Sequence, residues 1–477
     1  MRICAYVQER YSKGCYKNEC MDTRQFVGLR VVIDCLERAG YAVEYAGLAT
    51  VHTYDVVLVS LTSDCDWWPF IAERMRWRPG DYRVLIGGAG VLHVAPFLRW
   101  FDAAMFGRGE ELIVPLVRGI ERGERWEHES VCWADTFSPE RIYRIAQTDR
   151  PYGHRIRLSA KRDFCEGPIG CNHRCLFCGY TWHRRFVSPY REYRMEDGLF
   201  GSIEDRERAM LDLDERPGCI DWARLRTTAM DGFSERLRVG VNKKITRIIM
   251  QRFLEAMLRY EGAPHQIKLY NICGYPTETV EDWREFGEAL READGAVPAR
   301  TRPWSIVLHS TPFRPMPATP MACAPASRRS YRGEIGRTLG AGLRGNLIYQ
   351  GRSLWAVESM GTDSLATVML SMIAHRGCEG DSEAIARLCG TPKFWTASAA
   401  QREATLCRHF DMDRLFGPFT PQTLPSRYLR TYCAVERMWG RTPLEVTGDG
   451  KGRDDAEAVP QRDRAQHAQA GDVPGGV

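Results

Sequence analysis

The feature that most constrains this chain is a group of three cysteines within residues 170–180, which read GCNHRCLFCGY. Cys171, Cys175 and Cys178 have the spacing C-x3-C-x2-C, and Phe177 stands directly before the last cysteine. Three thiolates on one loop can bind three irons of a cubane iron–sulfur cluster, because such clusters are held through cysteine sulfur. The fourth iron then has no ligand from this stretch and is open to a reactant.

Two other interpretations of these cysteines are open. A zinc site could take its fourth ligand from His183 or Cys165, although zinc sites more often combine two C-x2-C pairs or a Cys/His finger. The cysteines could also be ordinary buried thiols, but the polar residues between them (Asn172, His173 and Arg174) disfavour an apolar core loop. We therefore favour the cluster and keep a zinc-stabilised protein as the alternative.

The composition is that of an ordinary soluble globular protein. The chain of 477 residues suggests about three domains. Apolar residues make up 44% of it and charged residues 27%, which are typical values. The formal charge of +5 permits an anionic substrate such as a nucleotide or nucleic acid without demonstrating one.

The cysteine content and the chain start indicate the compartment. The 17 cysteines are irregularly spaced, and the chain begins with an apolar strand pattern instead of a secretory leader. No apolar run approaches the roughly 20 residues that span a bilayer. We therefore expect a reducing cytoplasm and no membrane partner.

Residues 1–126 alternate short apolar runs with stretches of helical periodicity. Strands are predicted at 2–7, 42–45, 55–61, 83–86 and 102–106, and helices at 26–38, 69–77 and 107–120. This alternation predicts an α/β fold with a doubly wound parallel sheet, whose ligand crevice lies beyond the carboxyl ends of the strands.

The cysteine triplet, with an aromatic residue before its third cysteine, resembles the cluster motif of the radical S-adenosylmethionine (radical SAM) enzymes. In that family the open iron chelates the amino and carboxylate groups of SAM, and reduction cleaves SAM to a 5′-deoxyadenosyl radical. Three further stretches resemble family landmarks and follow in the family's order: 230–238 (MDGFSERLR), 269–279 (LYNICGYPTET) and 310–321 (STPFRPMPATPM).

This resemblance implies a partial (β/α) barrel over residues 154–324. Residues 155–159 should form its first strand and deliver the cysteine loop at their carboxyl end, where such barrels place their chemistry. The resemblance also implies an adenosyl or substrate site shaped by Asp231, Ser234, Gly274 and Pro276.

Small and hydroxyl residues follow two of the strands predicted in the first domain: Ser60, Thr62, Gly87 and Gly88. They resemble the cobalamin-binding domain that precedes the cluster in one large radical SAM class, where such residues lie along the nucleotide tail of the cofactor. No D-x-H-x-x-G stretch follows the first strand, so no histidine is supplied there as a lower ligand of cobalt. The alternative is a vestigial sheet that only packs against the barrel.

The rest of the chain carries weaker signals. Residues 127–153 read as a linker, residues 325–445 as a helical C-terminal domain without family landmarks, and residues 446–477 as a disordered tail. Arg184 and Arg185 lie among aromatic residues after the cluster, a mixture that suits stacked bases and phosphates.

The resemblance implies an enzyme with a [4Fe–4S] cluster and SAM that modifies an unactivated carbon. Methyl transfer is expected if cobalamin binds, and a rearrangement or another modification, for example of a nucleotide or nucleic-acid base, if it does not. A reductant such as flavodoxin or ferredoxin would be a partner. A zinc-stabilised nucleic-acid-binding protein is the non-enzymatic alternative, and the substrate is not identified by the sequence.

Overall fold

The computed structural model describes residues 1–8, 23–147, 152–159, 162–164, 174–182, 222, 225–262, 266–298, 304–329, 331–340, 348–349, 352–353, 355–358, 365–418 and 425–440. Several residues singled out in the sequence lie outside this set: Cys165, Cys171, His183, Arg184 and Arg185. The chain forms two compact units, Met1–Pro443 and Leu444–Val477. The second unit and the predicted tail (446–477) also lie outside the described residues.

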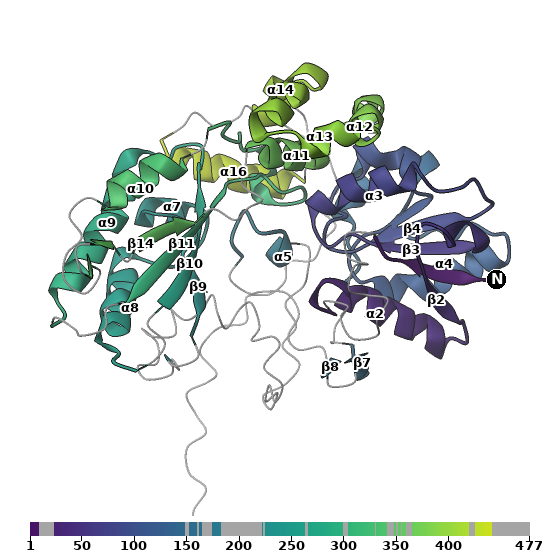
Figure 1. The fold of residues 1–477 in the computed structure, drawn as a ribbon, viewed down its shortest axis with the longest axis horizontal. Helices are drawn as coiled ribbons and strands as arrows, with labels where there is room; N and C mark the ends of the chain where they lie inside the picture. Colours follow the sequence, from purple (N-terminus) through teal and green to yellow (C-terminus); the bar gives the residue numbers. More distant parts are fainter. Residues whose placement is uncertain are drawn as a thin grey trace, which may run out of the picture. The chain divides into compact units, whose positions relative to one another are not determined.

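A six-stranded sheet is built near the N-terminus, with the strand order β2-β1-β3-β4-β5-β6 (Figure 1). Its strands are β1 (Ile3–Tyr6), β2 (Val43–Ala46), β3 (Val56–Ser60), β4 (Arg83–Gly87), β5 (Ala103–Met105) and β6 (Val131–Trp133). The first five strands are parallel, and β6 runs antiparallel to β5. The predicted α/β fold with a largely parallel sheet is confirmed. The strand order reverses between β1 and β3, so a topological switch point lies there.

Both faces of this sheet are buried, which explains its continuous apolar strands. Val56 and Leu58 of β3 enter one hydrophobic core, whereas Val57 and Val59 enter the other. The first core contains residues of α2 (Thr23–Arg38) and α4 (Gly109–Glu121), and the second contains residues of α3 (Trp67–Arg74). Alternate side chains of one short strand therefore fix helices on opposite faces.

The segment predicted as a linker is part of this sheet over its described residues. Its strand β6 pairs with β5, with Ala103 opposite Trp133, and Ile142 is buried in the second core. The three apolar residues of β6 are too few to stand out as a strand in a polar stretch. A linker is therefore the wrong description of residues 127–147.

A second, four-stranded sheet has the order β14-β11-β10-β9, with all strands parallel. The strands are β9 (Thr227–Ala229), β10 (Gln266–Cys273), β11 (Ser305–Pro312) and β14 (Trp355–Glu358), and the helices of this sheet's core are α8 (Arg247–Arg259), α9 (Val280–Gly295) and α10 (Arg332–Gly340) (Figure 1). Ile267 and Leu269 of β10 pack against these helices.

The first strand predicted for the barrel belongs elsewhere. Among the described residues, β7 (Ile156–Ser159) pairs only with β8 (Arg162–Phe164), antiparallel, in a separate hairpin. Arg157 stands between Ile156 and Leu158, and such alternation suits a half-exposed hairpin more than a buried parallel strand. The prediction that this strand belongs to the barrel and delivers the cysteine loop is therefore wrong for the described residues. Contacts with other parts of the chain have to hold the described cysteines.

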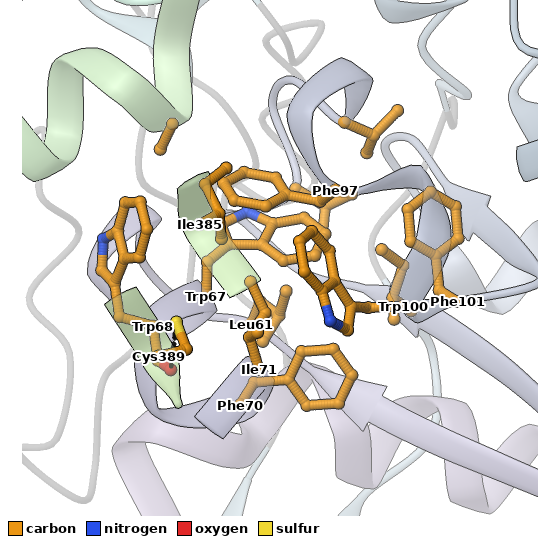
Figure 2. Close-up of a cluster of buried hydrophobic side chains, with 14 of the residues drawn as sticks. Leu61, Trp67, Trp68, Phe70, Ile71, Phe97, Trp100, Phe101, Ile385 and Cys389 are labelled. Carbon is orange, nitrogen blue, oxygen red and sulfur yellow. Dashed lines mark hydrogen bonds between the residues drawn. The ribbon is translucent and has the colours of Figure 1, made fainter. Parts of the chain in front are cut away.

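The C-terminal segment divides between the two sheets. Helix α10 and strand β14 join the second sheet, whereas α11 (Leu365–Arg376), α12 (Ser382–Cys389) and α14 (Ala399–His409) add residues to the second core of the first sheet. In that core the ring of Trp67 stacks on Phe97 at 4.0 Å between centroids, close to Ile385 and Cys389 of α12 (Figure 2). A single helical domain over 325–445 therefore does not describe this segment. None of the described helices has the length and hydropathy of a membrane span.

Candidate functional site

Two of the three predicted cluster ligands lie in one tight turn, residues 174–182, which we call the cysteine turn. The backbone N–H of Cys178 donates to the carbonyl of Cys175 at 3.1 Å, and the short helix α5 (Gly179–Trp182) follows. The indole N–H of Trp182 folds back to the same Cys175 carbonyl at 3.0 Å. Cys175 is buried and Cys178 is half-buried, so the two thiols are held by a turn with internal hydrogen bonds.

Two of the three further landmarks contact this turn, and so does a residue that closely follows the other one. The N–H of Leu176 donates to the carbonyl of Val241 at 2.9 Å, just after landmark 230–238, and the Leu176 carbonyl accepts from Met321 at 3.3 Å. The ring of Phe177 lies 6.5 Å from that of Tyr275, in landmark 269–279. Stretches up to about 145 residues apart in sequence therefore converge on two residues between the cysteines.

Asp231 follows β9 with a left-handed backbone, φ +53°. Its carboxylate forms an ion pair with the buried ammonium of Lys243 at 2.7 Å. Its carbonyl accepts from the hydroxyl of Tyr275 at 3.0 Å, and the next N–H, of Gly232, donates to Asn271 at 2.7 Å. The structure thus gives the Asp231 carboxylate an internal partner, in addition to any role that the resemblance assigns to it.

Ser234 joins the starts of two helices. Its hydroxyl accepts from the N–H of Leu237 as the N-cap of α7 (Glu235–Gly240) and donates to Asp282 in the first turn of α9. Asp282 also accepts from Arg236 at 2.6 Å and closes a capping box with Thr279. Thr279 and Asp282 have the spacing of a capping box, in which a threonine stands three residues before an acid at a helix start.

Gly274 and Glu278 close the turn after β10. Gly274 has φ +78°, and a Cβ there would lie 2.9 Å from the ring of Tyr331, so glycine is required. One carboxylate oxygen of Glu278 accepts from the N–H groups of Gly274 and Tyr275 at 2.7 and 3.1 Å, and the other accepts from the Trp283 indole at 2.6 Å. Burial raises the pKa of Glu278 to about 7, against these donors, which favour the ionised form.

Sequence reasoning missed Glu278 and Arg238 as positioning residues. The guanidinium of Arg238 is fully buried and donates to the carbonyls of Gly232, Phe233 and Ile245 at 3.0, 2.9 and 2.7 Å. Burial lowers its pKa to about 10. Both residues stand inside recognised landmarks, but only the fold shows which groups they hold. Pro276 is half-buried beside the turn of Gly274.

At the first sheet, two of the four predicted cofactor residues are used by the loops themselves. The hydroxyl and N–H of Thr62 both donate to Asp66, at 2.7 and 2.6 Å. Gly88 has φ +109°, and a Cβ there would lie 2.4 Å from the carbonyl oxygen of Leu61. Thr62 and Gly88 are therefore explained by the packing of the loops after β3 and β4, without a ligand.

Polar groups without partners remain at the switch point of this sheet. Ser60, at the end of β3, is half-buried and lies opposite Gly87 of β4 in the ladder. Gln8, two residues after β1, is 3% exposed, and neither atom of its carboxamide has a partner in the described structure. A buried carboxamide without partners is rare, and its place beside the switch point fits a polar ligand there. Sequence reasoning missed Gln8; it is the polar residue that ends the first apolar run.

A complete metal site is not visible in the described part of the chain. No group of three or more His, Cys, Asp or Glu side chains is placed there to hold a metal ion. Cys171, and the zinc ligands His183 and Cys165 of the alternative interpretation, lie outside it. Of the three predicted cluster ligands, the described residues therefore include two, Cys175 and Cys178.

No family model and no curated protein matches the chain. Matching solved structures include three of OxsB, which is described as a cobalamin-dependent S-adenosylmethionine radical enzyme. One has aqua-cobalamin and S-adenosylmethionine bound, one has aqua-cobalamin bound, and one is the selenomethionine-labelled apo form. Each is 12% identical to this chain, with TM-scores of 0.25, 0.24 and 0.25.

These matches cover 93%, 92% and 92% of this chain but only 62%, 61% and 61% of the OxsB chain. The chain thus spans less than two thirds of the length of its structural neighbour. TM-scores and an identity this low do not by themselves define a fold or an activity for this chain.

Proposed function

We propose that this chain is a radical SAM enzyme that binds a [4Fe–4S] cluster through Cys171, Cys175 and Cys178 and cleaves SAM by reduction. The observation that supports this most directly is the convergence of the family landmarks on the cysteine turn. Leu176 bonds to Val241 on one side and to Met321 on the other, and these contacts lie directly beside two of the proposed ligands. Cysteines that were close together by chance would not be expected to contact these particular stretches.

The chain's own residues would bind and orient the cluster and shield it from water. The cysteine thiolates are the donors, and the cluster with its bound SAM supplies the one-electron chemistry that generates a radical. Tyr275 packs behind the turn against Phe177, Phe313 and Trp439. Burial raises the pKa of Tyr275 well above its usual value, so its hydroxyl keeps its proton and its bond to Asp231.

The reaction and substrate extend this proposal. A radical enzyme of this kind modifies an unactivated carbon, and a flavodoxin or ferredoxin would supply the electron. The buried carboxamide of Gln8, which has no partner among the described residues, supports a polar ligand at the first sheet, where Ser60 ends β3. Cobalamin, which carries many amide groups, would suit this carboxamide, and methyl transfer would follow. Thr62 and Gly88 add nothing to this, because the loops explain them, and without cobalamin a rearrangement or base modification is the alternative.

The test is anaerobic reconstitution with iron and sulfide, followed by SAM and dithionite and quantification of 5′-deoxyadenosine. We expect wild-type protein to bind about four irons and to form 5′-deoxyadenosine. Cys171→Ala, Cys175→Ala and Cys178→Ala should lose both properties. Cys165→Ala, outside the triplet, and Cys378→Ala, which removes an exposed thiol, should keep both. Wild-type protein that takes up zinc but no iron would overturn the proposal.

A further inference from the structure

Two residues with left-handed backbones face each other at the cysteine turn. Arg174 has φ 51° and Asn242 has φ 60°. This conformation is tolerated by asparagine but costs other L-residues roughly 1–2 kcal/mol. The side-chain amide of Asn242 donates to the carbonyl of Arg174 at 3.0 Å. An interaction from another element therefore holds the strained residue directly before Cys175.

The segment that carries Asn242 is itself anchored. The N–H of Asn242 donates to Val239 at 3.0 Å, and the N–H of Lys243 donates to Arg238 at 2.7 Å. The ammonium of Lys243 is buried and paired with Asp231 at 2.7 Å. Asn242 is thus fixed by backbone bonds on one side and by a buried ion pair on the other.

Val241 and Asn242 form hydrogen bonds to the residues on both sides of Cys175. Asn242 holds the carbonyl of Arg174, the residue before Cys175, and the carbonyl of Val241 holds the N–H of Leu176, the residue after it. The two contacts are adjacent on the anchoring segment and flank a single residue on the turn. Together they fix the backbone from which the Cys175 thiol extends.

We propose that Asn242 is a positioning residue for the cluster: through its amide it fixes the backbone at Cys175 and thereby sets the stability and electronic properties of the bound cluster. The inference rests on the proposed function and deepens it. Groups that orient metal ligands without touching the metal commonly change metal affinity by about 10–100-fold when they are removed. Cluster potentials also depend on hydrogen bonds and solvent exposure around the sulfurs.

Two substitutions separate the effect of the amide from that of the backbone, and a third is a control. Asn242→Asp keeps the size and the tolerance for a left-handed backbone but presents only acceptors to the Arg174 carbonyl. Asn242→Gly keeps the backbone freedom without a side chain. Gln266→Glu is the matched amide-to-acid control at an exposed position at the start of β10. The melting temperature of each apo-protein shows whether it is folded.

The measurements are the EPR spectrum of the reduced cluster, its midpoint potential and the rate of iron loss to a chelator. We expect Asn242→Asp and Asn242→Gly to lose iron about tenfold faster than wild type, within the range for groups that orient metal ligands, and to show altered EPR spectra and potentials. Gln266→Glu should match wild type in all three. The Gly variant keeps the test valid if the Asp variant does not fold.

The outcomes separate this inference from the proposed function. Wild type that assembles a cluster, with both Asn242 variants indistinguishable from it, overturns the positioning role and leaves the enzyme class intact. A changed Asp variant with a wild-type-like Gly variant also overturns it, because backbone freedom would then suffice. Wild type that assembles no cluster overturns both.

Discussion

Among single residues, Glu278 shows how one half-buried carboxylate closes the turn after β10. Its oxygens accept from the N–H groups of Gly274, Tyr275 and Trp283. Glu278→Ala leaves these donors without an acceptor, and each buried donor left unsatisfied costs about 1–3 kcal/mol. We expect a loss of about 2–4 kcal/mol in the free energy of unfolding, allowing for water that enters the space.

Urea denaturation measures this loss, and Glu281→Ala is the matched control. Glu281 is exposed in the first turn of α9, three residues after Glu278, and pairs with Arg284 at the surface, where ion pairs contribute about 0–1 kcal/mol. Equal effects of the two substitutions would contradict the role of Glu278.

His93 should make the stability depend on pH. Its Nε2 lies 3.0 Å from the carbonyl of Gly377, to which it donates, and its Nδ1 is buried with no partner among the described residues. Burial lowers the pKa of His93 to about 4. Between that value and the unfolded pKa of about 6.5, the unfolded chain binds more protons, so stability is fully present above about 6.5 and is lost as pH falls.

The measurement compares wild type with His93→Gln by urea denaturation at pH 7, 6 and 5. The glutamine cannot take up a proton, so the variant should lack this part of the pH dependence. We expect the wild type to lose about 1–2 kcal/mol more than the variant between pH 7 and pH 5. Parallel curves for the two proteins would show that His93 does not titrate in this way.

At the scale of elements, the sequence predicted those whose burial pattern is local. The apolar run of β3 and the helix α2 lie close to their predicted positions, because their residue patterns report the faces that they bury. The strands β6, β7 and β14 were missed or misplaced. Each has only three or four residues, and its pairing depends on a partner that the local sequence does not specify.

The candidate site shows the same division. The cysteine turn and the landmarks are contiguous motifs, and sequence reasoning found them together. The hydrogen-bond partners of Asp231, Ser234 and Thr62 come from other parts of the fold or from local capping. A polar side chain in a motif can therefore be recognised from the sequence, whereas the group that it holds cannot.

The loops after β3 and β4 allow a test at this scale. At Gly88 a Cβ would meet the carbonyl oxygen of Leu61 at 2.4 Å, and the backbone is left-handed at φ +109°. Gly123 is also left-handed, at φ +71°, but has nothing within 4 Å. We expect Gly123→Ala to cost about 1–2 kcal/mol through backbone strain alone, and Gly88→Ala to cost about 3 kcal/mol or more because two backbones must separate.

Thermal and urea unfolding of the two alanine variants measure this difference. Equal losses would mean that the loops can move apart freely. Close packing of the loops would then not explain why position 88 is a glycine. The close approach of a bound ligand would be the better explanation.

At the scale of the whole molecule, the end of α11 joins loops that follow both sheets. His375 lies 3.3 Å from Asp64, in the loop after β3, and 3.1 Å from the carbonyl of Pro315, after β11. Arg376 donates to the carbonyls of Ala322 and Leu415, at 2.7 and 3.1 Å. Although burial opposes it, the proximity of His375 and Arg314 holds the pKa of Asp64 well below its usual range. One helix end thus links the loops after both sheets, including the segment that contacts the cysteine turn.

We propose that Cys171, Cys175 and Cys178 leave one iron of the cluster open for SAM. The most direct measurement is electron–nuclear double resonance on the reduced, reconstituted protein with SAM carrying ¹⁵N in its amino group. We expect a change in the EPR spectrum when SAM is added and a ¹⁵N coupling that shows the amino group bound to iron. A spectrum unchanged by SAM, with no ¹⁵N coupling, would contradict it.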